Sequence, residues 1–183
     1  MRLKLRSRKE SNMIQVYTGE GKGKTTAALG LSLRAAGYGM KVVIVQFLKS
    51  MDTSELVVLE KIDNITIMRN EEKHGFVWNM SEEEKERVRD SHNRNLQRAI
   101  DMINSSQCDM LVLDELMAAY NKNMIDRQAV RRLVEEIPDR VELVMTGRDA
   151  DDFFMEKADY VTEMKKIKHP YDRGIHARRG IEN

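Results

Sequence analysis

The segment Gly19-Glu20-Gly21-Lys22-Gly23-Lys24-Thr25-Thr26 contains the residue types that a triphosphate-binding loop requires. Glycines allow consecutive backbone N–H groups to turn toward anionic oxygens, the lysines supply positive charge, and the hydroxyl after them can bind Mg²⁺. An apolar run precedes the segment and a helical pattern follows it, so the positive N-terminal end of a helix also faces the site. The segment therefore predicts a site for ATP or a close relative, with each residue from Gly19 to Thr26 at the nucleotide.

The loop is one residue shorter than the usual P-loop pattern. That pattern places a glycine five residues before the glycine of Gly-Lys-Thr, whereas here the position is Thr18 and the glycine follows at Gly19. A shortened loop need not hold the β- and γ-phosphates in the usual register. We therefore expect a reaction other than ordinary γ-phosphoryl transfer.

Charged residues elsewhere in the chain are candidates for the same site. Asp114 and Glu115 directly follow the apolar run 110–113, and carboxylates at a strand end beside a phosphate loop can hold Mg²⁺, as in the Walker B pattern. Arg148 follows the next apolar run and could direct a fork of donors at phosphate oxygens. The alternatives are solvated turn residues for the acids and a surface arginine for Arg148. Arg34 is more readily interpreted as a solvated helix residue.

The only tryptophan, Trp78, lies two residues after Phe76. If this segment is extended, both aromatic side chains lie on one face. On residue types alone, the pair is more readily a core or covering contact than a platform for a ligand.

Length and composition restrict the class of protein. With 183 residues, 41% of them hydrophobic, the chain suffices for one well-packed domain and is short for two. We expect a single domain over 1–183, with a flexible basic tail over 1–12 and a C-terminal tail over 165–183 that closes near the site. The formal net charge of +1 gives no argument for nucleic acid or a membrane as partner.

Cysteine content and hydropathy indicate the compartment. Cys108 is the only cysteine, which excludes an internal disulfide and is compatible with a reducing cytosol. The basic N-terminus is not followed by the apolar stretch of a signal peptide, and no run approaches the length of a membrane span. We expect a cytoplasmic protein.

Short apolar runs alternate with helical patterns along the chain. The predicted strands are 13–17, 41–48, 65–68, 110–113, 141–146 and 160–164, and the predicted helices are 26–36, 81–104 and 126–136. Ser81 begins a capping-box pattern, and Pro138 stops the third helix. This alternation predicts an α/β fold with a three-layer parallel sheet, helices on both faces, and the RecA-like P-loop nucleotide-binding arrangement. Ligands of such sheets bind at the carboxyl ends of the strands, where the Gly19–Thr26 loop falls.

Seven motifs in this order resemble those of the P-loop corrinoid adenosyltransferases and cover nearly the whole chain from Met13 onward. The short loop is itself typical of that family. Glu20 departs from the asparagine that is more common there, and an acid beside phosphates is unfavourable unless it points away. The motifs are Gly19 to Thr26, Arg34-Ala35-Ala36-Gly37, Val45-Gln46-Phe47-Leu48-Lys49, Gly75-Phe76-Val77-Trp78, Leu113-Asp114-Glu115-Leu116, Thr146-Gly147-Arg148 and Lys168-His169-Pro170-Tyr171-Asp172-Arg173-Gly174.

The resemblance implies transfer of the 5′-deoxyadenosyl group of ATP to the cobalt of a reduced Co(I) corrinoid, with release of triphosphate. The product would be adenosylcobalamin or an adenosylated precursor. The resemblance also implies Mg²⁺ on Thr25 and Glu115, catalytic roles for Lys24 and Arg148, and contact of Arg34 with the nucleotide. An electron donor such as a flavoprotein or flavodoxin, and a homodimer, follow from the same resemblance.

The resemblance also gives the aromatic pair a catalytic role. Phe76 and Trp78 match residues that pack under the corrin ring, where they displace the lower axial ligand and keep water from the cobalt. Loss of that ligand raises the Co(II)/Co(I) potential, so a cellular reductant can reach the nucleophilic Co(I) state.

Two other functions remain open on the residues alone. A RecA-like P-loop ATPase or kinase would release phosphate or ADP instead of triphosphate. A nucleotide-dependent interaction or nucleic-acid module is supported only by the basic tails.

Overall fold

The computed structural model describes residues 13–49, 53–70, 75 and 77–181, and the strands in these ranges form one parallel sheet. All the predicted strands are confirmed, with small shifts at their ends. Their order across the sheet is β3-β2-β4-β5-β1-β6. The strands are β1 (Ile14–Thr18), β2 (Val42–Gln46), β3 (Ile65–Met68), β4 (Met110–Asp114), β5 (Glu142–Thr146) and β6 (Tyr160–Glu163).

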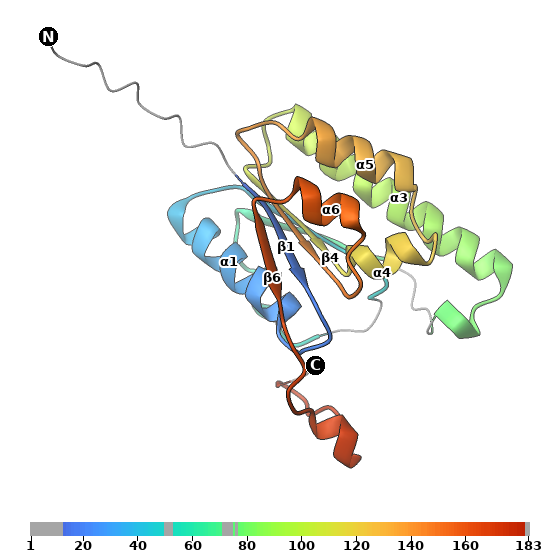
Figure 1. Ribbon diagram of the computed structural model, residues 1–183. Helices are drawn as coiled ribbons and strands as arrows, with labels where there is room; N and C mark the ends of the chain where they lie inside the picture. The colour runs from blue at the N-terminus through green and yellow to red at the C-terminus, as the bar shows by residue number, and fades with distance from the viewer. Residues whose placement is uncertain (1–12, 50–52, 71–74, 76, 182–183) are drawn as a thin grey trace, which may run out of the picture.

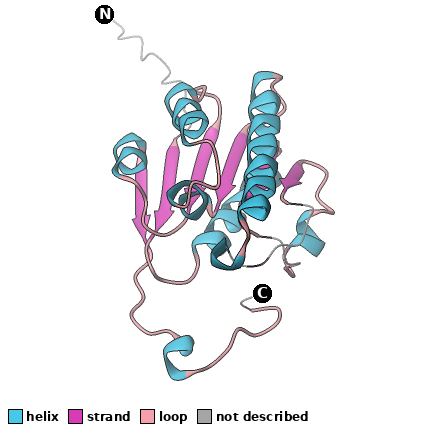
Figure 2. Ribbon diagram, turned by 90° about the vertical axis from the view of Figure 1, so that its right-hand side faces the viewer, coloured by secondary structure: helices cyan, strands magenta, loops and turns pink. Residues whose placement is uncertain are grey.

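Helices cover both faces of the sheet (Figures 1 and 2), which confirms the predicted three-layer α/β fold. One face carries α1 (Lys24–Tyr38) and the short α2 (Leu56–Leu59). The other carries α3 (Glu82–Asn104), α4 (Leu116–Asn121), α5 (Arg127–Glu136) and α6 (Asp152–Lys157). The predicted helices correspond to α1, α3 and α5, whereas α2, α4 and α6 were not predicted.

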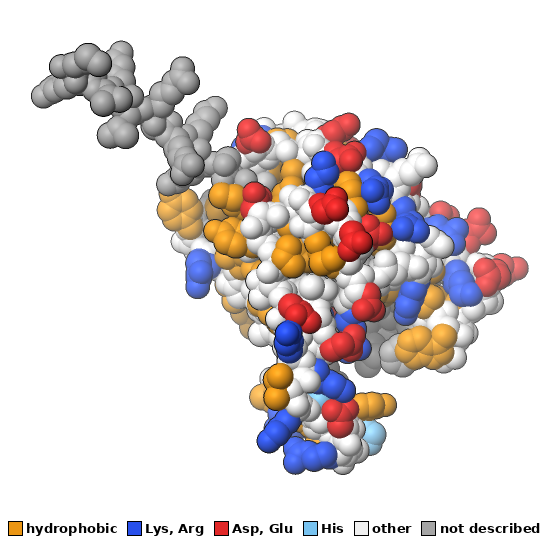
Figure 3. Space-filling model, viewed as in Figure 1, with side chains coloured by type: hydrophobic (Ala, Val, Ile, Leu, Met, Phe, Trp, Pro, Cys, Tyr) orange, Lys and Arg blue, Asp and Glu red, His pale blue; other side chains and the backbone are white. Residues whose placement is uncertain are grey.

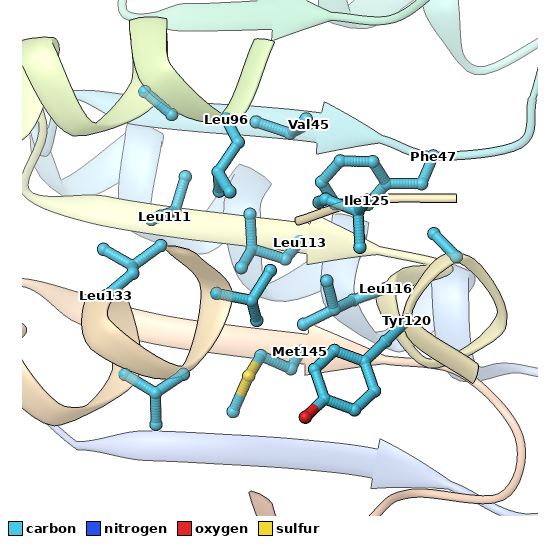
Figure 4. Packing of buried hydrophobic residues seen from close by; sticks show 14 of the residues in the cluster. Val45, Phe47, Leu96, Leu111, Leu113, Leu116, Tyr120, Ile125, Leu133 and Met145 are labelled. Atoms are coloured by element: carbon cyan, nitrogen blue, oxygen red, sulfur yellow. The ribbon is translucent and has the colours of Figure 1, made fainter. Parts of the chain in front are cut away.

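The central strands β2, β4 and β5 supply side chains to two separate cores, whereas the edge strand β6 is exposed along its length. In β2, Val43 and Val45 pack into the core beneath α3, α4 and α5, while Val42 and Ile44 pack into the core beneath α1. This division follows from the pleat, because successive side chains point to opposite faces. Figure 4 shows the first core, in which Val45, Leu111, Leu113 and Met145 from the sheet face Leu96 of α3, Leu133 of α5 and Tyr120 of α4.

Local sequence signals determine where two long helices begin. Ser81 caps α3 with its hydroxyl 3.2 Å from the Glu84 N–H, and the Glu84 carboxylate accepts from the Ser81 N–H at 2.7 Å. The predicted capping box is thus confirmed. Asp126 caps α5 by accepting from two backbone N–H groups of its first turn. Across the described ranges, no helix combines the length and the apolar character needed to cross a bilayer.

Candidate nucleotide-binding site

The glycine-rich loop connects the end of β1 to the first residue of α1, as predicted. Gly19 and Gly23 have φ values of 95° and 117°, a left-handed backbone that glycine adopts at little cost. The Gly21 N–H donates to the Met164 carbonyl oxygen at 2.5 Å. A Cβ on Gly21 would lie 2.6 Å from that oxygen, so only glycine fits there. The loop is therefore closely packed against the chain that leaves the edge strand β6.

Lys24 lies inside this loop. Its side chain is buried, and Nζ donates to the carbonyl oxygens of Gly19 at 2.5 Å and Gly21 at 2.9 Å. Burial lowers the pKa of Lys24, Arg148 acts in the same direction, and Glu115 and Glu20 oppose them. The loop thus holds a desolvated cation ready for an anionic ligand.

Asp114 is the centre of the polar network beside the loop. It ends β4, in register with Gln46 at the end of β2, and is 0% exposed. Its Oδ1 accepts from Thr25 Oγ1 at 2.9 Å and from Thr146 Oγ1 at 2.8 Å. Its Oδ2 accepts from Lys49 Nζ at 2.6 Å and from Gln46 Nε2 at 3.1 Å. One buried carboxylate therefore joins the loop, β2, β4 and β5 at their carboxyl ends.

Glu115 has a different position from its neighbour. It is half-buried, has a left-handed φ of 59°, and its N–H donates to Thr146 Oγ1 at 2.9 Å. Its charge acts on Lys24, whose pKa it raises. Sequence reasoning assigned Glu115 and Thr25 to the metal but gave no role to Lys49, Gln46 or Thr146. The motifs containing these three residues were the signal that could have identified them.

Arg148 and Glu20 meet at the outer side of the loop, with Nη1 and Oε2 2.9 Å apart. Both side chains are exposed, and the acid that is unfavourable beside phosphates is here paired with a cation. Arg148 thereby lies beside the loop, and its contact with the phosphates stays a prediction. Lys22 is an exposed loop residue, and Thr26 is exposed in the first turn of α1. Arg34 is exposed on α1, about 15 Å along the helix axis from Lys24, and its role in nucleotide contact stays a prediction.

The residues around Thr25 have the chemistry that Mg²⁺ requires. Hydroxyl and carboxylate oxygens are its preferred ligands, and few of them come from protein when a nucleotide supplies the rest. Within the described ranges, no cluster of three or more His, Cys, Asp or Glu residues forms a separate metal site. Gln46 Oε1 is buried and has no hydrogen-bond partner there, so a metal-bound water could donate to it. The donor set fits Mg²⁺.

The aromatic pair is only partly described. Trp78 is 70% exposed, with Lys122 Nζ 5.5 Å from its ring centroid, and Phe76 lies outside the described residues. Val77–Asn79 forms a 3₁₀ turn, η1, so the extended conformation considered for this segment is wrong at Trp78. The exposure of Trp78 argues against the alternative of a core contact.

The C-terminal segment begins at the loop and then leaves the domain. Met164 and Lys165 contact the glycines, but the 3₁₀ turn η2 (Pro170–Arg173) stands away from the body of the protein (Figures 1 and 2). Figure 3 shows basic and hydrophobic side chains on this arm. The predicted closure of 165–183 over the site stays a prediction.

A phosphate-loop protein with a RecA-like parallel sheet is the class that this fold and site define. The family model "ATP:corrinoid adenosyltransferase BtuR/CobO/CobP" matches residues 10–183. A corrinoid adenosyltransferase of Sinorhizobium sp. is 38% identical over 94% of this chain and 81% of its own length. The corrinoid adenosyltransferase of Escherichia coli K12 is 34% identical over 94% of this chain and 86% of its own length. The corrinoid adenosyltransferase CobA of Salmonella typhimurium is 32% identical over 96% of this chain and 88% of its own length. The chain belongs to the ATP:corrinoid adenosyltransferase family.

The predicted resemblance and activity are thereby confirmed. The enzyme catalyses ATP-dependent adenosylation of corrinoids, and the ATPase or kinase alternative is not favoured. Among solved structures, EssC (ATPases 2 and 3) of Geobacillus thermodenitrificans aligns over 94% of this chain and 35% of that one, at 14% identity and a TM-score of 0.47. The fold assignment therefore rests on the strand order and helix layers described above.

Proposed function

We propose that the Gly19–Thr26 loop holds the triphosphate of ATP while the cobalt of a reduced Co(I) corrinoid attacks C5′ of the ribose. The Co–C bond forms with the electron pair of Co(I), the C5′–O bond breaks, and triphosphate leaves with that bond's electrons. The leaving group gains negative charge in this step. The observation that carries the proposal is the buried Lys24 ammonium inside the glycine loop, because a desolvated cation stabilises developing charge strongly.

Other basic groups would assist the leaving triphosphate. The loop amides and Lys22 would contact its oxygens, and Arg148 could turn from Glu20 to the ligand, because an exposed ion pair contributes little free energy. Arg34 would contact a more distant part of the nucleotide. In this arrangement Lys24 and Arg148 act on the reacting group and are the catalytic cations.

Mg²⁺ would be held by Thr25 and Glu115, with Asp114 Oδ1 accepting a hydrogen bond from the Thr25 hydroxyl. Bound there, it would supply further positive charge to the triphosphate. Asp114 contributes by orienting Thr25, because the hydrogen bond to Oδ1 fixes the direction of the Thr25 hydroxyl and leaves its lone pairs to face a cation.

The corrinoid would lie near Trp78 and Phe76. An exposed tryptophan beside a lysine offers a large apolar surface with a polar rim, which suits a flat macrocycle with amide substituents. There the pair would exclude the lower axial ligand and ease reduction to Co(I) by a flavoprotein or flavodoxin. We further propose a homodimer that acts in the cytoplasm.

Replacement of the tryptophan tests this role separately from nucleotide binding. Trp78→Ala should lower turnover from Co(II) corrinoid plus reductant at least about tenfold, whereas the Kd for Mg·ATP should stay within about twofold. Calorimetric titration and the corrinoid spectrum give the two values, and Phe76→Ala should behave alike. Tyr160→Ala, an exposed aromatic on β6, is the control. Equal losses in both measurements would refute the corrinoid role.

The chemistry is tested by anaerobic incubation with Mg·ATP and a chemically reduced Co(I) corrinoid. Formation of a light-sensitive adenosylcorrinoid together with intact triphosphate is expected. Formation of ADP or phosphate with an unchanged corrinoid spectrum would contradict the proposal.

A further inference from the structure

Lys49 contacts the centre of the site but has no role in the reaction proposed above. Its Nζ lies 2.6 Å from Asp114 Oδ2 and 3.1 Å from Thr25 Oγ1, and the lysine side chain is only 23% exposed. The ammonium therefore bridges one residue proposed to bind Mg²⁺ and the carboxylate that orients it. A cation between a hydroxyl and a carboxylate occupies the kind of position that a divalent metal takes.

The hydrogen bonds at Thr25 show why the two cations compete. The Thr25 hydroxyl proton is donated to Asp114 Oδ1, so a lone pair of Oγ1 accepts from Lys49. A metal bound to Thr25 must use a lone pair of the same oxygen. The ammonium and the metal would also be close enough to repel each other strongly in a partly desolvated site.

The backbone before Lys49 is arranged to bring it there. Leu48 has a left-handed φ of 54°, which a leucine adopts rarely. Its N–H donates to Nε2 of the buried His92 at 3.2 Å, and the adjacent Phe47 N–H donates to the Asp114 carbonyl oxygen at 3.0 Å. Strained backbone persists where surrounding contacts hold it, and it often marks a functional residue.

We propose that Lys49 is a resident cation at the metal position, and that a divalent metal enters by displacing its ammonium from Thr25. The inference rests on the proposed metal site at Thr25. It assigns Lys49 two functions: it neutralises the buried Asp114 in the nucleotide-free protein, and it lowers the affinity for metal that arrives without a nucleotide. The site then favours the metal–nucleotide complex, whose phosphates compensate the displaced charge.

Binding of Mn²⁺ alone tests the inference without nucleotide, corrinoid or turnover. Titrations followed by the electron paramagnetic resonance of free Mn²⁺ should show about tenfold tighter binding to Lys49→Met than to the native protein. Lys49→Arg keeps a cation and should bind as weakly as the native protein. Lys41→Met, at the opposite end of β2, is the matched control and should leave the affinity unchanged. Unchanged or weaker binding by Lys49→Met would overturn the inference.

A second measurement uses the native chain, in case Lys49→Met does not fold. Reductive methylation of lysines, read at Lys49 by mass spectrometry, should proceed faster when Mn²⁺ saturates the protein, while labelling of Lys41 stays constant. An unchanged rate at Lys49 would overturn the inference, as would absence of Mn²⁺ binding in every variant. Neither result would contradict the proposed transfer reaction, because that reaction is tested separately with Mg·ATP and reduced corrinoid.

Discussion

Much of the polar network at the site depends on the Asp114 carboxylate. A fully buried carboxylate is stable only when hydrogen bonds and a cation compensate its lost hydration, and here four donors surround its two oxygens. Three of these donors come from other strands or their ends, so the carboxylate also fixes the relative positions of β2, β4 and β5 beside the loop.

Asp114→Asn should therefore destabilise the protein even without ligand. The amide removes the charge and presents N–H donors to groups that already donate, leaving Lys49 without its carboxylate. We expect a loss of about 2–4 kcal/mol in the free energy of unfolding, measured by urea denaturation. Asp90→Asn, on the exposed side of α3, is the control and should change it by less than about 0.5 kcal/mol. A loss for Asp114→Asn as small as that of the control would show that the network contributes little.

Lys24 should couple nucleotide binding to proton uptake. Because its pKa in the folded protein is below the ordinary lysine value, the unfolded chain binds more protons than the folded one in the window between the two pKa values, and stability rises with pH there. Triphosphate oxygens would raise the pKa again. Calorimetry in buffers of different ionisation enthalpy should therefore show proton uptake on Mg·ATP binding that grows as the pH rises through the lowered pKa of Lys24. Lys24→Met should abolish most of this uptake, and uptake that is unchanged in the variant would assign the proton to another group.

At the scale of elements, the loop and the end of β6 form one unit. The Gly21 position tolerates no side chain because the Met164 and Lys165 carbonyl oxygens lie 2.6 and 2.8 Å from a Cβ there. Gly30, in the middle of α1, meets nothing within 4 Å of a Cβ. The same substitution at these two glycines should therefore have opposite effects.

Gly21→Ala should lower the free energy of unfolding by about 1–3 kcal/mol and weaken ATP binding, because the loop must move away from Met164. Gly30→Ala should raise the free energy of unfolding by about 0.5–1 kcal/mol, since alanine loses less backbone freedom in a helix. Urea denaturation of both variants measures the difference. The packing argument fails if Gly21→Ala is as stable as the native chain.

The sequence predicted the elements that carry a long hydrophobic pattern. It did not predict the short helices or the contacts that depend on unusual backbone conformations. The strands and α1, α3 and α5 carry apolar periodicity or caps. In contrast, α4 and α6 have six residues each, which is too short for a helical period to be recognised, although Asp151 caps α6. Which of two adjacent acids lies on Thr25 depends on the left-handed turn at Glu115, and the approach of Lys49 depends on the same conformation at Leu48. Such conformations at non-glycine residues are set by tertiary contacts, so residue types alone do not indicate them.

At the scale of the whole molecule, the domain and the C-terminal arm differ in how they are held. The two cores lie between the sheet and the helices on its two faces. By contrast, the side chains of Ile167 and Tyr171 on the arm are 83% and 72% exposed. The contacts at η2 are local, such as the ion pair of Lys166 with Asp172 at 3.0 Å. The arm therefore contributes little to the stability of the domain, although its first residues lie against the phosphate loop.

Deletion of 166–183 should separate stability from activity. The free energy of unfolding should change by less than about 0.5 kcal/mol, because little apolar surface of the arm is buried. The kcat/KM for corrinoid should fall at least about tenfold if the arm closes over the site, because its apolar and basic side chains would then contact the ligands. Tyr171→Ala and Arg173→Ala divide the effect between apolar surface and charge. Full activity of the shortened chain would exclude closure, and a large loss of stability would mean that the arm packs on the domain in solution.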